Sequence, residues 1–227
     1  MTKHFQDELD ALKQKLLTMA SHAETSLSNA IKSLVDRNDI LAREVIGDDS
    51  IIDHFEIEID EMAIALLALQ GPMASDLRLI TVAMKISQDL ERVGDEATTI
   101  ARRSLELSQE PQLKPYVDIP RMTHCAMEML NQGLDAFVNH DPDKARAVIP
   151  QDKTVDDINR QLHRELVSYM IERPTTITRC LNLMVISKSI ERIADHAKNI
   201  AEEVVFLYEG RDIRHTGKTA AVPATTK

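Results

Sequence analysis

The sequence predicts an all-α protein made of two tandem, pseudo-symmetric antiparallel three-helix bundles, with six long helices in total. Three observations support this fold class. The 227 residues include no Trp, four Phe, three Tyr and six Gly, whereas an all-β chain needs more aromatic residues and turn glycines. Apolar residues recur at helical spacing along most of the chain. The second half of the chain also repeats the pattern of the first half, which indicates a duplicated unit.

The first three helices are predicted from apolar stripes and the breaks between them. One stripe runs from Leu9 to Leu34, with Lys, Glu and Asp on the opposite face. Asn38 and Asp39 interrupt the pattern and offer an N-cap for a second helix over about 40–70. Gly71-Pro72 ends that helix and starts a third helix, which reaches about residue 108.

The last three helices follow the same plan. One helix is expected over about 118–139, and Asp141-Pro142 caps the next one, which reaches about residue 172. Pro150 lies inside that middle helix and predicts an irregularity there. Pro174 opens the last helix, which reaches about Tyr208.

Composition sets the expected boundaries between the two units. Three prolines fall within a short stretch that joins the two halves, and the residues from Gly210 onward are polar. We therefore expect the following division: a first unit at 1–109, a linker at 110–120, a second unit at 121–209 and a disordered tail at 210–227.

The internal repeat is clearest in the third helix of each unit. Met84–Leu107 aligns with Met184–Leu207 at an offset of 100. The identical pairs are Met84/Met184, Ile86/Ile186, Ser87/Ser187, Glu91/Glu191, Arg92/Arg192, Asp95/Asp195, Ala97/Ala197, Ile100/Ile200, Ala101/Ala201 and Leu107/Leu207. Gly94 corresponds to Ala194, and a small residue at this position lets a neighbouring helix approach closely.

The charge of the chain limits its partners. The net charge of −10 argues against nucleic acid, because phosphate binding needs a basic surface. It also disfavours docking to an anionic membrane. The longest apolar run, at residues 62–69, is too short for direct membrane insertion. A cation or a basic partner protein is the natural complement.

Each unit carries two pairs of acids spaced i, i+4, which places both members of a pair on one helix face. The pairs are Asp49/Asp53 with Glu91/Asp95, and Asp152/Asp156 with Glu191/Asp195. Two such pairs on adjacent helices would form a cluster of four carboxylates, which favours a multivalent cation that prefers oxygen ligands. His196 follows Asp195 and would add a nitrogen ligand to the second site. The alternative is a solvated acidic edge on each helix.

Three classes of function remain open from the residues alone. The first is a non-enzymatic adaptor whose acidic sites bind metal. The second is a carboxylate-bridged metal enzyme, which needs Glu-x-x-His pairs that this sequence does not contain. The third is a structural helical scaffold. The sequence also has no glycine-rich phosphate loop, no G-x-S-x-G and no His-Glu-x-x-His. We therefore predict no catalytic residues.

Two segments resemble the signature of the PhoU family, and a third resembles that family's turn into its third helix. They are Glu91–Asp95, which reads ERVGD, Glu191–Glu202, which reads ERIADHAKNIAE, and Gln70–Arg78, which reads QGPMASDLR. The resemblance covers about residues 5–210. In one respect the chain departs from the pattern, because the second unit has no Ala-x-Asp-Leu-Arg run after Pro174.

This resemblance implies two three-helix bundles, each with a metal cluster held by Glu/Asp-x-x-x-Asp motifs, here the eight acids named above. It implies multivalent metal ions such as iron, zinc, manganese or magnesium. It also implies a cytoplasmic negative regulator of the phosphate-starvation response. Such a regulator connects the ATPase subunit of a phosphate ABC transporter with a phosphate-sensing histidine kinase, and a homodimer is expected.

Overall fold

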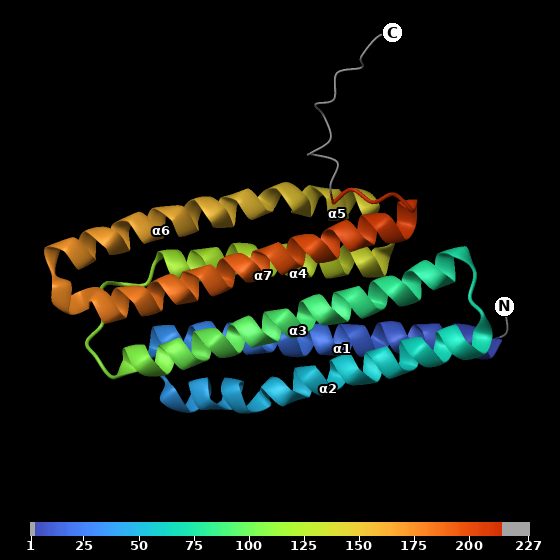
Figure 1. The fold of residues 1–227 in the computed structure, drawn as a ribbon, viewed down its shortest axis with the longest axis horizontal. Coiled ribbons are helices and arrows are strands. Elements are labelled where there is room, and N and C mark those ends of the chain that lie inside the picture. The colour runs from blue at the N-terminus through green and yellow to red at the C-terminus, as the bar shows by residue number, and fades with distance from the viewer. Residues whose placement is uncertain (1–2, 215–227) are drawn as a thin grey trace, which may run out of the picture.

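The first repeat consists of three long helices. The computed structural model describes residues 3–214, without the side chains of residues 69 and 70, and every regular element in this range is a helix (Figure 1). The helices of the first repeat are α1 (Lys3–Asp36), α2 (Asp39–Gln70) and α3 (Ala74–Ser108).

The second repeat follows the same plan with one interruption. Its helices are α4 (Asp118–Asn139), α5 (Pro142–Val148), α6 (Asp152–Glu172) and α7 (Ile177–Glu209). Short 3-10 turns at Ile149–Gln151 and Pro174–Thr176 precede α6 and α7. The first of these turns contains Pro150 and divides the middle helix into α5 and α6, because proline cannot donate a backbone hydrogen bond. The predicted fold class is confirmed, with one of its six helices split in two.

Local capping explains where several helices begin and end. The Asn38 side chain accepts hydrogen bonds from the backbone N–H groups of Ile40 and Leu41, which starts α2. Gly71 follows α2 with φ of 52°, a left-handed conformation that suits glycine at this position. The Asp141 side chain accepts from the N–H of Lys144 and starts α5.

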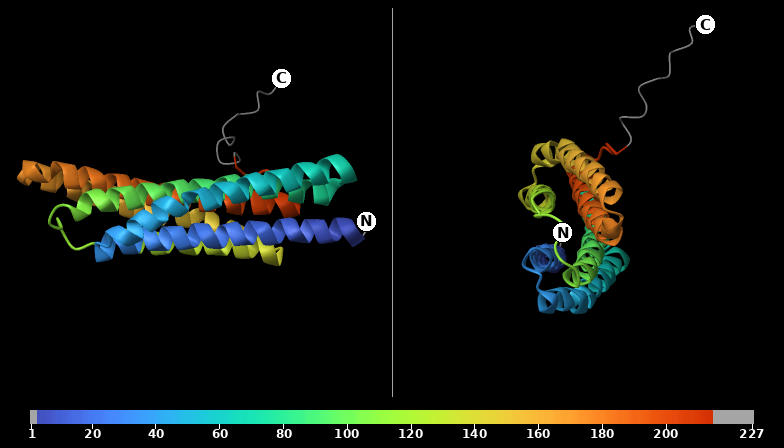
Figure 2. Two further views of the ribbon diagram at one scale, coloured as in Figure 1. Left: turned by 90° about the horizontal axis from the view of Figure 1, so that it is seen from below. Right: turned by 90° about the vertical axis from the view of Figure 1, so that its left-hand side faces the viewer.

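The helices form two layers. Figure 1 and the right-hand view of Figure 2 place α2, α3, α7 and α6 side by side in a curved layer, with α1 and α4 on one side of it. The third helices, α3 and α7, are antiparallel neighbours in the middle of this layer and join the two repeats. Each third helix packs on the other two helices of its own repeat, so its inner face carries much of the core, including Leu90, Ile100, Ile190 and Ile200.

Gly94 allows α2 and α3 to approach closely. A Cβ atom at this position would lie 2.8 Å from Ile52 Cδ1 on α2. The corresponding residue of the second repeat is Ala194, which is fully buried. Gly94 therefore lets the middle and third helices of the first repeat approach beside its predicted acidic cluster, and Ala194 keeps the equivalent buried position of the second repeat small.

The connection between the repeats and the end of α7 complete the described chain. α4 begins at Asp118, so Pro120 lies in the first turn of that helix, where a missing N–H costs little. After α7, the Arg214 guanidinium forms an ion pair with Glu203 at 2.8 Å. The remainder of the predicted disordered tail, residues 215–227, lies outside the described residues. Within residues 3–214, no helix is both long and apolar enough for a membrane span.

Candidate metal centres between the middle and third helices

The first set of predicted acids is brought together between α2 and α3. Asp49 and Asp53 lie on α2, and Glu91 and Asp95 lie on α3. Burial raises the pKa of Asp49, and the charges of Asp53 and Asp95 raise it further. A hydrogen bond from Thr98 works against these effects. Since carboxylates from both helices raise the pKa of Asp49, the four acids form one cluster, here called the first acidic cluster.

Glu91 is the most perturbed member of the first acidic cluster. Burial raises its pKa to about 7, and the charge of Asp95 contributes next. Its side chain is 17% exposed, and its Oε2 atom lies 3.4 Å from Arg92 Nε, an ion pair without a hydrogen bond. The charge of Glu56 on α2 also raises the pKa of Glu91.

Glu56 is a member that the sequence analysis missed. It lies three residues after Asp53 and four before Asp60, so the three acids share one face of α2. Burial raises the pKa of Glu56, and the charge of Asp60 adds to this effect. The signal was present in the sequence as an extension of the i, i+4 pattern.

The second set of acids is brought together in the same way between α6 and α7. Burial raises the pKa of Asp156, and the charges of Asp152 and Glu191 raise it further. The pKa of Asp195 is raised by the same three causes. The four acids Asp152, Asp156, Glu191 and Asp195 form the second acidic cluster.

Two lysines distinguish the second cluster from the first. Lys198 Nζ lies 2.9 Å from Asp152 Oδ2, and Lys188 forms an ion pair with Glu191. The first repeat has Thr98 and Gln88 at the equivalent positions. The second cluster therefore contains two built-in cations, whereas the cations acting on the first are arginines.

The donor set fits a hard cation. Every member is a carboxylate, a ligand type that magnesium, manganese and iron accept more readily than zinc does. Glu91 Oε2 and Asp152 Oδ1 are buried oxygen atoms without a hydrogen-bond donor. In residues 3–214 no three His, Cys, Asp or Glu side chains stand close enough together to hold an ion as placed. Binding therefore requires carboxylates to rotate about their side-chain bonds.

His196 contacts the other repeat instead of the second acidic cluster. Its Nδ1 atom lies 2.8 Å from Asp89 Oδ1 on α3, and Asn199 Nδ2 donates to the same oxygen at 3.3 Å. The ring nitrogen that forms this contact faces the boundary between α3 and α7. The structure therefore gives His196 a role in joining the repeats, and its role as a metal ligand stays a prediction.

Comparison with known proteins identifies the same repeated unit. The family model described as the PhoU domain matches residues 16–104 and 119–204. A Pseudomonas aeruginosa protein named phosphate-specific transport system accessory protein PhoU homolog is 41% identical over 220 residues, which cover 96% of this chain and 91% of that protein. The Escherichia coli phosphate-specific transport system accessory protein PhoU is 35% identical over 94% of this chain and 88% of its own length.

Solved structures agree with the sequence relatives. The crystal structure of PhoU from Pseudomonas aeruginosa has a TM-score of 0.88 at 41% identity and covers 91% of this chain and 100% of its own. A phosphate transport system regulatory protein PhoU from Streptococcus pneumoniae has a TM-score of 0.87 at 30% identity, with 92% and 99% covered. The likeness extends over both repeats.

Proposed function

The chain belongs to the PhoU family, and we propose that it is an accessory protein of a phosphate transport system that represses the phosphate-starvation response. The observation that carries this proposal is the match of both repeats to the family, with relatives that align along nearly the whole chain. The names of those relatives associate them with phosphate transport. In this proposal the protein acts in the cytoplasm as a homodimer and without catalysis.

We further propose that the two acidic clusters bind multivalent metal ions and that metal controls the surface that partners contact. A bound cation would supply positive charge to carboxylates that otherwise repel one another across two helices. The carboxylates of Glu91 and Asp95 on α3 would then be held against those of Asp49 and Asp53 on α2. The pKa of Glu91, raised to about 7, supports this, because an oxygen ligand set that resists ionisation gains most from a cation.

The proposed partners are the ATPase subunit of the phosphate transporter and a phosphate-sensing histidine kinase. The α2 and α6 helices form the two edges of the curved layer in Figure 1, so a change at either cluster would move an outer helix. A local change of charge at a cluster would in this way alter the surface that partners contact. The alternative functions are a carboxylate-bridged metal protein without a phosphate role and a structural scaffold.

Metal content tests the site assignment. We would purify the untagged protein and measure bound metal by inductively coupled plasma mass spectrometry, beside the double variant Asp95→Ala/Asp195→Ala. A matched control is Asp10→Ala/Asp143→Ala, which removes two exposed acids that lie outside both clusters. We expect metal in the wild type and the control and a loss from the cluster variant, with helicity by circular dichroism unchanged. Full metal content in the cluster variant would contradict the ligand assignment.

A genetic experiment tests the regulatory role separately. Deletion of the gene should raise expression of a phosphate-starvation reporter in phosphate-rich medium, and the wild-type gene should restore repression. Complementation with Asp95→Ala/Asp195→Ala separates the two parts of the proposal. Repression by this variant, if it binds no metal, would support the regulatory role and contradict the idea that metal controls it. Unchanged reporter expression in the deletion strain would contradict the regulatory role and favour the scaffold.

Copurification tests the partners. A tagged form of the protein should retain the transporter ATPase subunit and the sensor kinase from a detergent extract of cells in which both are expressed. If the tagged protein retained neither the ATPase subunit nor the kinase above the level of a tagged control protein of similar charge, the adaptor role would be contradicted.

A further inference from the structure

The contact between α3 and α7 has two halves: side chains bridge the helices in one half, and the other half contains an open groove. Where the start of α3 meets the end of α7, side chains bridge the two helices. Lys85 Nζ lies 3.0 Å from Glu203 Oε2, and Arg78 Nε donates to the backbone oxygen of Leu207 at 3.2 Å. Glu203 is buried, so these contacts close this half of the interface.

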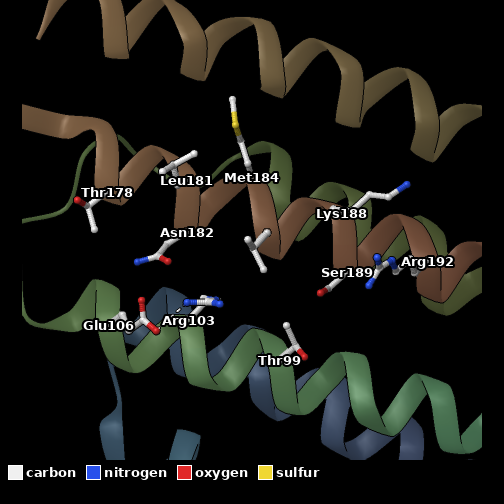
Figure 3. Close-up of a pocket in the computed structure, with 11 residues that line it drawn as sticks. Thr99, Arg103, Glu106, Thr178, Leu181, Asn182, Met184, Lys188, Ser189 and Arg192 are labelled. Atoms are coloured by element: carbon white, nitrogen blue, oxygen red, sulfur yellow. Dashed lines mark hydrogen bonds and ion pairs between the residues drawn. The ribbon is translucent and has the colours of Figure 1, made fainter. Parts of the chain in front are cut away.

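The other half contains a groove of about 660 Å³ between the end of α3 and the start of α7. Thr99 and Arg103 line it from α3, and Asn182, Ser189 and Arg192 line it from α7 (Figure 3). A volume in the range of about 300–1,000 Å³ is typical of sites for small organic molecules. Inorganic phosphate alone would leave most of this space unfilled.

Two buried polar side chains in the groove lack partners. Asn182 is 6% exposed and Ser189 is 2% exposed. Among residues 3–214, neither side chain forms a hydrogen bond with another protein group, and Figure 3 shows both directed from α7 toward α3. Neither the Asn182 amide nor the Ser189 hydroxyl is among the fully buried polar atoms of the described residues that lack a partner, so both open onto the groove. Both groups are therefore available to form hydrogen bonds with a ligand there.

The charges around the groove indicate the sign of that ligand. Arg103, Arg192 and Glu106 line it, whereas Lys188, also in the lining, pairs its ammonium group with Glu191 of the second acidic cluster. Each arginine already has one carboxylate partner through its Nη1 atom, Glu106 for Arg103 at 2.8 Å and Glu96 for Arg192 at 3.0 Å. A guanidinium has five N–H donors, so donors remain for oxygen atoms of a ligand.

We propose that this groove binds a phosphate monoester of an organic molecule about the size of a nucleotide. A phosphate monoester carries close to two negative charges near neutral pH, and its oxygen atoms would accept hydrogen bonds from the N–H groups that Glu106 and Glu96 leave free on Arg103 and Arg192. The amide of Asn182 and the hydroxyl of Ser189 would bond the polar edge of the organic body, and Leu181 and Val185 would contact its apolar part. None of the eight cluster acids lines the groove, although Lys188 connects it to the second acidic cluster through an ion pair with Glu191.

The first test measures binding without metal. The full-length protein, in a buffer with EDTA, would be melted in the presence of phosphate monoesters and of their dephosphorylated counterparts. The probes are AMP, GMP, CMP, UMP, pyridoxal 5′-phosphate and glucose 6-phosphate, with inorganic phosphate and sulfate as simple anions. At about 100 times its Kd, one of the esters should raise Tm by about 5 °C, and its dephosphorylated counterpart should not. No shift with any ester would overturn the proposal.

Variants then assign the site. Asn182→Leu replaces the unpaired amide with an apolar side chain of similar size, so the ligand-free protein should melt at the same temperature or higher. Arg103→Gln removes a charge at the rim, and Arg121→Gln removes an exposed charge on α4 as the matched control. Titration calorimetry with the active ester should give at least tenfold weaker binding for Asn182→Leu and Arg103→Gln, and unchanged binding for the control. Wild-type affinity in either groove variant would overturn the assignment.

Discussion

The two acidic clusters occupy equivalent places in the two repeats, yet they balance their charge in different ways. In the second cluster, Lys198 and Lys188 stand beside Asp152 and Glu191. In the first, the residues equivalent to these lysines are uncharged, Arg92 pairs with Glu91 and Asp95, and the pKa of Glu91 is still raised to about 7. A duplicated site can therefore keep its carboxylates while its two copies differ in how far nearby cations neutralise them. We infer that the first cluster depends more on an external cation.

The largest expected effect comes from forcing the helices of the first cluster apart. Gly94→Leu should destabilise the protein by about 3 kcal/mol, because its side chain would collide with Ile52 across the α2–α3 contact. For a protein of this size, Tm should fall by about 6–12 °C in a thermal melt. Gly94→Ala should cost less, since the nearest atom is the end of a flexible side chain. An unchanged Tm for the leucine variant would show that α2 and α3 are not held closely at this position.

The next effect comes from removing a cation from the second cluster. Lys198→Met should destabilise the metal-free protein by about 2 kcal/mol, because Asp152 is buried and would lose its ion-pair partner. Urea unfolding in EDTA measures this change. Manganese should restore much of the lost stability, since the cation would replace the ammonium group. Equal destabilisation with and without manganese would mean that the lysine stabilises through packing.

A smaller effect concerns the dependence of stability on pH. The folded-state pKa of Glu91, about 7, is above its usual value of 4.5, so the folded protein binds this proton more tightly than the unfolded chain does. Metal-free protein should therefore lose stability as pH rises from about 4.5 to 7, by about 1–2 kcal/mol after allowance for solvent screening. Glu91→Gln should remove this loss. A variant with the same pH profile as the wild type in urea unfolding would contradict the role of Glu91.

The smallest effect on stability comes from exchanging a charge between the clusters. Gln88→Lys places a lysine three residues before Glu91, as Lys188 stands before Glu191. This i, i+3 pair should stabilise the fold by about 0.3–0.5 kcal/mol and should lower the pKa of Glu91. It should also weaken manganese binding at the first cluster about tenfold in calorimetry. Lys188→Gln is the reverse exchange, and an increase in affinity for Gln88→Lys would refute the electrostatic explanation.

The sequence was sufficient for the fold because the signals were local or repeated. The cap at Asn38, the stop at Gly71 and the interruption at Pro150 depend on neighbouring residues, and each appears in the structure. The eight acids were found because their spacing recurs in both halves. Glu56 could have been found only from its spacing to Asp53 and Asp60 on one helix face, since the equivalent residue of the second repeat is Asn159.

Contacts between the repeats were not predictable from the sequence. His196 follows Asp195 in the chain but bonds Asp89 on α3, and the pattern within a single helix does not determine which helices become neighbours. The arrangement of charges in the groove was not predictable either. Helix packing brings Arg103 and Arg192, each with a carboxylate partner, together from distant parts of the sequence.

Calorimetric titration of manganese into single-cluster proteins tests the central claim most directly. Glu91→Gln/Asp95→Asn disables the first cluster, and Glu191→Gln/Asp195→Asn disables the second. Because the second cluster contains its own lysines, the protein that retains only the first cluster should bind manganese about tenfold more tightly at pH about 7.5. Equal affinities, or tighter binding by the protein that retains only the second cluster, would contradict the account.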